Sequence, residues 1–247
     1  MHLHLPKPLH GWRAFAGEVG IIVVGVLIAL GAEQAVEAVH KRSEAREARS
    51  EIEAEVVTDI TRIKQRAFAA DCVDARLNEM DEIIDGQKAD GAIRHPSLIG
   101  RPPRYAIETT RWDAASQSGR VSLLPSDWQA QFGFLYTTLR YHSQMNTEEE
   151  TVWSRLNALS GIERITPEVR FALKQDIAQA RFDNASLRQV ANIIVDRAAR
   201  AGLHPTNRHD PPFTVCWPTS TSAEMAAKLM ARRNSLTEKV SPASAFR

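Results

Sequence analysis

Scarce cysteine and few aromatic side chains exclude several protein classes for this chain of 247 residues. Its two cysteines are too few for a disulfide-dense scaffold or a zinc site made of four cysteines. Glycine and proline contribute 12 residues each, far fewer than a collagen-like or low-complexity chain contains. Aromatic residues make up only 6%. Together with plentiful alanine, glutamate and arginine, this composition favours helices over a β-sandwich.

The chain also lacks an excess of charge of one sign, with 31 basic and 30 acidic residues. A neutral chain has no electrostatic footprint for nucleic acid, so we expect no nucleic-acid partner. The sequence contains no phosphate-binding glycine loop, no dinucleotide fingerprint and no G-x-S-x-G motif. It therefore predicts neither an enzyme nor a cofactor.

One hydrophobic segment predicts a membrane anchor. Residues 19–32 carry no charge, and nineteen residues separate Arg13 from Glu33 with only Glu18 interrupting them. As a helix, nineteen residues span about 28 Å, close to a bilayer core of about 30 Å. We expect an anchor over residues 14–36, with Glu18 near the helix N-terminus at the membrane interface, where the helix dipole favours a carboxylate.

Two other interpretations of this segment stay open. It also suits a buried core helix, or a signal peptide cut after the small residues Ala29 and Gly31. An uncleaved anchor fits better, because no proline or glycine occurs between Gly31 and Gly86 to end the helix. Gly25 and Ala29 form a pair of small residues four apart, as do Ala16 and Gly20, and such pairs permit close helix approach.

Three stretches resemble an uncharacterised bacterial family of single-pass inner-membrane proteins. Residues 18–30 (EVGIIVVGVLIAL) are similar to the family's anchor, in which an acidic residue precedes an Ile/Val-rich run ending in G-V-L-I-A-L. Residues 112–124 (WDAASQSGRVSLL) are similar to its central motif, and residues 72–77 (CVDARL) to its proteobacterial members. The resemblance implies a cytoplasmic tail, one span and a helical domain beyond the membrane, but no activity.

The charges beside the anchor favour a cytoplasmic location for the large domain. Two basic residues precede it and four follow it, and a bare count would place the large domain in the cytoplasm. The four are interleaved with glutamates, however, and the resemblance implies the opposite orientation. We expect the N-terminus in the cytoplasm and the C-terminal domain in the periplasm of a bacterial inner membrane.

The whole chain reads as an all-α protein in which one N-terminal transmembrane helix continues into a long helix and then an α-helical bundle. We expect a tail at 1–13, the anchor at 14–36, a membrane-proximal helix at 37–70, the bundle at 71–235 and a flexible tail at 236–247. An apolar stripe from Ala45 to Ala67 has a mean step of 3.67 residues, which is typical of a straight amphipathic helix. The further expected helices cover residues 71–85, 105–118, 125–145 with a continuation to 160, 166–202 as the longest, and 222–235.

Several polar residues were candidates for chemistry and have plainer explanations. His204, His209 and Asp210 share a Pro-rich loop, which is a poor platform for a metal, so we expect exposed side chains there. The acidic run 148–150 predicts a solvated helix face or a helix start. Asn184 lies on an otherwise apolar stripe, where it either fixes the register between helices or marks an exposed edge.

The two cysteines predict a disulfide between Cys72 and Cys216. Cys72 opens a predicted helix, and Cys216 lies in a Pro-rich segment, within a β-prone run at 213–217, that a bridge would tie to the bundle. The bond needs an oxidising compartment, and the alternative is two separate buried thiols.

Taken together, these features predict a membrane-anchored, non-enzymatic helical domain. Its expected partners are the lipid bilayer and either another envelope protein or a second copy. A ligand-binding sensory domain that acts through a partner protein is the alternative.

Overall fold

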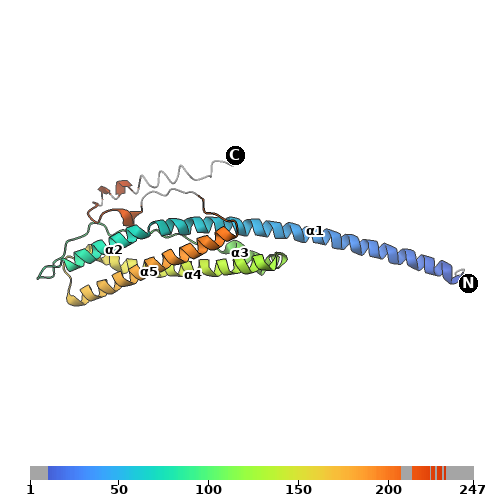
Figure 1. The fold of residues 1–247 in the computed structure, drawn as a ribbon, viewed down its shortest axis with the longest axis horizontal. Helices are drawn as coiled ribbons and strands as arrows, with labels where there is room; N and C mark the ends of the chain where they lie inside the picture. The colour runs from blue at the N-terminus through green and yellow to red at the C-terminus, as the bar shows by residue number, and fades with distance from the viewer. Residues whose placement is uncertain (1–10, 207–212, 223, 226, 230, 232–247) are drawn as a thin grey trace, which may run out of the picture.

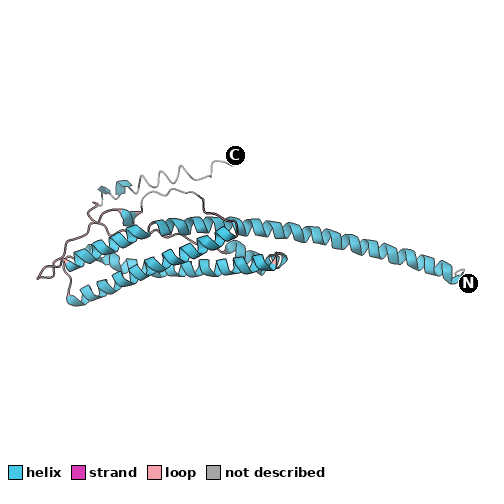
Figure 2. Ribbon diagram, viewed as in Figure 1, coloured by secondary structure: helices cyan, strands magenta, loops and turns pink. Residues whose placement is uncertain are grey.

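The computed structural model describes residues 11–206, 213–222, 224–225, 227–229 and 231. Over these residues the protein is all-α, as predicted, and Figure 2 shows helices joined by loops. The described residues contain no strand, only an isolated antiparallel bridge between Ala92 and Arg164. A transmembrane-length helix that continues into a helical bundle is therefore the architecture of the chain.

Helix α1, Gly11–Phe68, is the longest element at 58 residues. The prediction that the longest helix covers residues 166–202 is wrong, because the anchor and the membrane-proximal helix form one unbroken rod. Figure 1 shows this rod leaving the bundle with no described element beside its N-terminal half. That half contains one segment long and apolar enough to cross a membrane, with a mean hydropathy of 2.3 and none of it buried.

The C-terminal half of α1 lies in the bundle because its apolar residues recur on one face. Ala48, Ile52, Val56 and Ile60 are fully buried, which confirms the predicted stripe. They pack against α4, Ser126–Leu156, and α5, Pro167–Arg200, together with the short helix α3, Thr110–Gln117, and the 3-10 helix η1, Arg120–Leu123. This cluster forms the half of the bundle nearest the exposed rod.

Helix α2, Ala70–Asp85, takes the place of α1 in the other half of the bundle. A break at Ala69 separates the two helices. Leu77, Met80 and Ile84 of α2 pack against the second half of α4 and the first half of α5. The 3-10 helices η2, Asn157–Gly161, and η3, Thr214–Cys216, pack against the same cluster. Because α4 and α5 contribute to both clusters, they hold the two halves together.

Local sequence signals set several helix ends as expected. Thr166 caps α5 by accepting a hydrogen bond from the Val169 amide, with Pro167 in the first turn. Gly119 adopts a φ of +77° just beyond α3, a conformation that glycine takes without steric cost. Both ends therefore follow from short-range chemistry.

Several of the expected elements have different bounds in the structure. Helix α3 begins five residues later than expected, and α4 takes the continuous alternative, running without interruption past Met145 to Leu156. Residues 213–217 form no strand, because η3 occupies 214–216. Of the helix expected at 222–235, Ser222 is not helical, whereas residues 224–225, 227–229 and 231 are helical. The expected tail at 236–247 lies outside the described residues.

Candidate functional site

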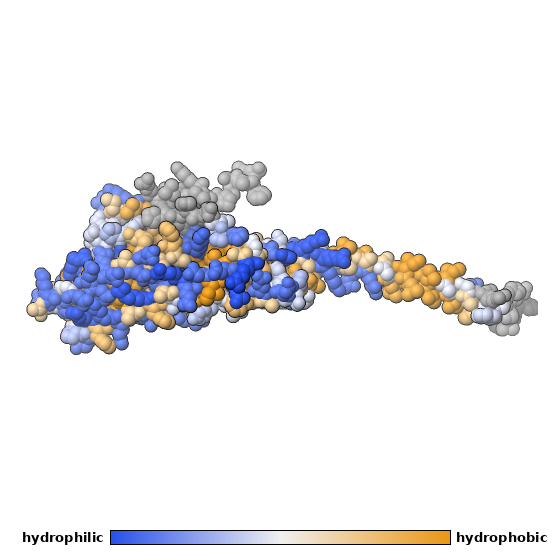
Figure 3. All heavy atoms as spheres, viewed as in Figure 1, coloured by the Kyte–Doolittle hydropathy of each residue, from blue (hydrophilic) through white to orange (hydrophobic). Residues whose placement is uncertain are grey.

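The residues assigned to the anchor lie on the exposed half of α1. Glu18, Gly25 and Ala29 are all exposed, and a Cβ added at Gly25 would meet no atom within 4 Å. Figure 3 shows the segment as an apolar stretch near the N-terminal end of the rod, followed by a more hydrophilic stretch before the bundle. Nothing in the chain itself covers this apolar surface within the described part of the structure.

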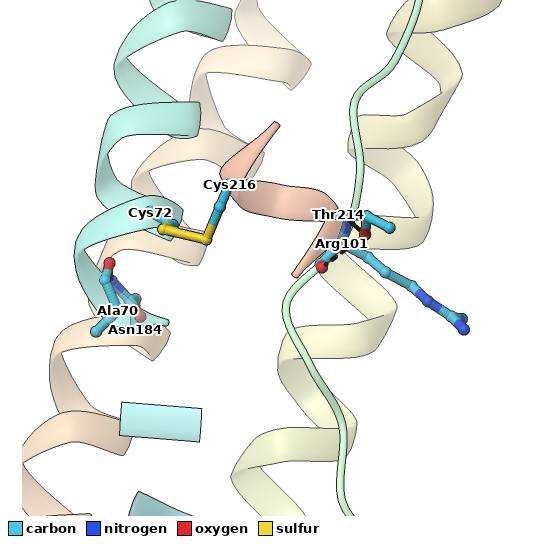
Figure 4. Close-up of a disulfide and its surroundings, with 6 residues drawn as sticks. All are labelled: Ala70, Cys72, Arg101, Asn184, Thr214 and Cys216. Atoms are coloured by element: carbon cyan, nitrogen blue, oxygen red, sulfur yellow. Dashed lines mark hydrogen bonds between the residues drawn. A yellow bond between two sulfur atoms is a disulfide. The ribbon is translucent and has the colours of Figure 1, made fainter. Parts of the chain in front are cut away.

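The two cysteines are joined as predicted. Cys72 in the first turn of α2 and Cys216 in η3 form a disulfide, with their Cα atoms 4.9 Å apart and 144 positions apart in sequence. The separation lies within the range that a disulfide requires. Figure 4 shows the bond crossing from α2 to the segment that contains η3. The bond therefore ties the chain beyond α5 back to the bundle.

A second set of contacts holds the same segment against the loop after α2. The amides of Ser97 and Leu98 both donate to the carbonyl of Thr219, at 2.8 and 3.1 Å. Gly100 has a φ of +74°, and a Cβ placed there would lie 2.6 Å from the Thr214 carbonyl oxygen. Glycine is needed at this position for both its conformation and its lack of a side chain. The buried Arg76 of α2 donates to the carbonyls of the same loop.

A buried polar network lies at the break between α1 and α2. Arg66 of α1 donates to Glu149 of α4, with one contact at 3.2 Å, and to Asn184 Oδ1 of α5 at 3.1 Å. Asn184 in turn donates to the Ala70 carbonyl at 2.9 Å and to Asp74 Oδ1 at 2.8 Å. One asparagine therefore links α5 to the last turn of α1 and the first turn of α2.

This network settles two open expectations. Asn184 is completely buried, which excludes the exposed edge and leaves the role of fixing helix register. Residues 148–150 lie inside α4, so they are no helix start, and Glu149 is only 2% exposed, so the predicted solvated face is wrong for this residue. Burial raises the pKa of the Glu149 carboxyl, and the adjacent Arg66 guanidinium opposes that rise. The arginine is 83 positions away in sequence, so no local pattern could have paired them.

Two carboxylates of α1 hold the start of α3 in place. Glu55 accepts hydrogen bonds from the Arg111 amide at 2.9 Å and the Tyr136 hydroxyl at 2.7 Å. Asp59 accepts from the Glu108 amide at 3.1 Å. The residues before Thr110 are therefore extended along α1, which explains why α3 begins later than its sequence suggests. Burial raises the pKa of Asp59 to about 7 and also raises that of Tyr136.

His142 of α4 is another buried titratable group. Its side chain is only 2% exposed, and neither ring nitrogen has a hydrogen-bond partner among the described residues. Burial lowers its pKa to about 4, and the positive charge of Arg66 adds to that effect. The imidazole is therefore neutral at physiological pH.

An open groove of about 670 Å³ lies where α1 enters the bundle. Glu51, Glu55 and Glu108 line it together with Arg111, so carboxylates outnumber guanidinium groups. Arg111 contacts Glu51 at 3.4 Å. Such a surface offers hydrogen bonds and charge to a small cationic or zwitterionic ligand. No prediction from the sequence concerned this groove, although Glu51 and Glu55, four residues apart on α1, could have indicated it.

The expected absence of a metal centre concerns a loop that the structure describes only in part. His204 is exposed, whereas His209 and Asp210 lie outside the described residues. Over the described ranges, no group of three His, Cys, Asp or Glu side chains could hold a metal ion.

Comparison with known proteins found no matching protein-family model, no matching curated protein and no matching solved structure. The resemblance to a bacterial family of single-pass proteins therefore stays a prediction based on the three stretches that suggested it.

Proposed function

We propose that this chain is a non-enzymatic interaction module anchored in a bacterial inner membrane, with a cytoplasmic N-terminus and a periplasmic helical bundle. The observation that carries the proposal is the continuity of α1. Its exposed N-terminal half has the length and composition of a membrane span, and its C-terminal half supplies the core of the bundle. A helix shared in this way couples the bundle to the membrane without a flexible linker.

The disulfide supports the periplasmic orientation. Bonds of this kind persist in oxidising compartments, and the bacterial periplasm is one of them. The pairing of Cys72 with Cys216 closes a loop of 144 positions and joins two parts of the bundle that are remote in sequence. A domain held in this way is suited to the outer face of the inner membrane, where thiols are oxidised.

The rod also sets the height of the bundle. Residues 37–43 are exposed and helical, and the side chains of α1 begin to be covered at Glu44. At about 1.5 Å per residue, this stalk holds the bundle roughly 10 Å from the membrane surface. A fixed distance of this kind favours contacts with other envelope proteins at a defined height.

The proposal is tested by protease protection and capture in cells that express the full chain. Protease added to spheroplasts should digest the bundle, whereas a cytoplasmic marker should stay intact until lysis. Crosslinking in native membranes followed by purification should then recover one specific protein partner, or a second copy of the chain. Protection of the bundle before lysis would overturn the orientation, and release of the chain by alkaline carbonate would overturn the anchoring.

The groove favours a second candidate function, a ligand-binding sensory domain that acts through a partner protein. It lies on α1 itself, so a bound ligand would contact the helix that leads to the membrane. Spermidine and arginine are suitable probes, since both present ammonium or guanidinium groups to carboxylates. Either probe should raise the melting temperature of the full chain, and substitution of Glu51 by glutamine should reduce that shift. The absence of any shift with both probes would count against this candidate.

A further inference from the structure

The exposed half of α1 carries a continuous uncharged seam. Its members alternate by three and four positions, which gives a mean step of 3.5 residues, the period of a left-handed coiled coil. All of them are exposed in the structure. The seam consists of Ile22, Gly25, Ala29, Ala32, Val36, Val39 and Ser43.

The seam extends past Val36, the last residue of the expected anchor, into the stalk. Val39 is 66% exposed there, although Glu37 and Lys41 beside it form an ion pair typical of a helix in water. A single helix in water gains nothing from an exposed valine in this position. Burial of Val39 needs a second protein surface that follows the same helix.

Charge complementarity identifies that surface as a second copy. With Val36 and Val39 in the two core positions of a parallel pair, Arg42 of one copy lies beside Glu47 of the other, the arrangement that stabilises coiled-coil dimers. Within the described part of the chain, neither Arg42 nor Glu47 forms an ion pair, whereas the neighbouring Glu37 and Lys41 pair with each other. Arg42 and Glu47, like Glu33 and Arg46, are therefore unpaired among the described residues of one copy, and the parallel arrangement brings Arg42 and Glu47 together.

The seam points away from the chain's own bundle. Ser43 and the bundle-facing Ala45 are two residues apart, which turns the helix by about 200°. Ala32 and the buried Ile52 are twenty residues apart, which leaves about 160° between their directions. Two copies can therefore meet back to back along α1 with both bundles on the outside. Anchors that enter one membrane in the same direction are already parallel.

We propose that two copies of this chain associate in parallel along the seam at residues 22–43, around a two-fold axis normal to the membrane. The inference rests on the proposed anchoring and deepens it by naming the partner. It also selects between the two pairs of small residues in the anchor. Gly25 and Ala29 belong to the seam, whereas Ala16 and Gly20 lie on another face of the helix.

Cysteine crosslinking of the full chain in its membrane tests the pairing directly. The native protein has no free cysteine within the structure, so an introduced thiol reports only on its own position. Val36→Cys and Ser43→Cys place the thiol on the seam, and Ala38→Cys and Lys41→Cys place it about half a turn away on the same exposed stalk. Under mild oxidation, the two seam variants should give at least tenfold more disulfide-linked dimer than Ala38→Cys and Lys41→Cys. Equal crosslinking at all four positions, or none, would overturn the proposal.

A second pair of variants separates packing from mere proximity. A Cβ at Gly25 or at Gly31 would meet no atom within 4 Å in one copy, so both positions accept a larger side chain in the monomer. Gly25→Leu should reduce crosslinking of the Ser43→Cys protein several-fold, whereas Gly31→Leu, off the seam, should leave it unchanged. Equal effects of the two would contradict the seam. Carbonate extraction of each variant shows separately whether the chain is anchored, so failure of anchoring and failure of pairing are distinguishable.

Discussion

Replacement of Arg66 by methionine tests how the buried polar network contributes to the bundle. Arg66 is 2% exposed and contacts Glu149, also 2% exposed, and the fully buried Asn184. Methionine keeps most of the volume of the arginine stem and removes all its donors. The substitution therefore leaves a buried carboxylate without its counter-charge and an amide oxygen without its donor.

The expected cost is large compared with the stability of a domain. Removal of one partner from a buried ion pair costs about 3–5 kcal/mol, against a total of about 5–15 kcal/mol for a typical domain. An exposed pair of similar geometry provides the control. Arg155 contacts Asp176 at 2.6 Å with half of its side chain exposed, so Arg155→Met should cost less than about 1 kcal/mol.

Urea unfolding of the full chain in detergent, followed by circular dichroism, measures both changes. Replacement of Arg66 by methionine together with Glu149 by leucine should recover most of the stability, because the uncompensated charge is then absent. A cost below about 1 kcal/mol for Arg66→Met would refute the reasoning. A double variant as unstable as the single one would show that packing, and not charge, explains the loss.

Four further predictions concern the buried titratable groups and the segment that contains η3. Asp59 has a pKa of about 7 when folded and an ordinary value near 3.8, so the folded state holds the proton more tightly. Stability is therefore highest below about pH 4 and falls by up to about 4 kcal/mol towards pH 7, and Asp59→Asn should remove that fall from the urea midpoints. His142 acts in the opposite direction, since its pKa drops from 6.5 to about 4 on folding; stability falls as the pH drops through that window, and His142→Leu should abolish the loss. The loop of 144 positions predicts that Cys216→Ser lowers the free energy of unfolding by at most about 5 kcal/mol, and an unchanged urea midpoint would argue against the bond. Gly100→Ala should increase proteolysis of that segment more than Gly119→Ala does, because both glycines have positive φ but only Gly100 faces a carbonyl within 3 Å.

The elements that short-range patterns describe were predictable from the sequence. The apolar stripe from Ala45 to Ala67 marks the bundle face of α1, because burial of a helix on one side imposes its own period on the residues. The Thr166 cap and the glycine at 119 mark helix ends through local hydrogen bonding and backbone freedom. The cysteine pair was predictable for a different reason, since two cysteines allow only one internal bridge.

The polar interior could not be predicted because its contacts join remote parts of the chain. Glu149 belongs to an acidic run that suits water, and only Arg66 from α1 makes its burial tolerable. Residues 105–109 suit a helix, yet Asp59 holds the Glu108 amide and Glu55 holds the Arg111 amide along α1. In each case a tertiary hydrogen bond or ion pair outweighs a local preference of a few tenths of a kcal/mol per residue.

The two periods of α1 account for the different surroundings of its two halves. Up to Ser43 the uncharged positions recur every 3.5 residues, whereas from Ala45 the buried positions recur every 3.67 residues. The first period suits a symmetric partner that winds around the helix, and the second suits a nearly straight helix packed in its own bundle. The period changes between Ser43 and Ala45, where the seam ends on one side of the helix and the buried stripe begins on the opposite side. The two surfaces therefore consist of different residues. One continuous helix is thereby able to hold its own bundle on one side and to present the opposite side to a second chain.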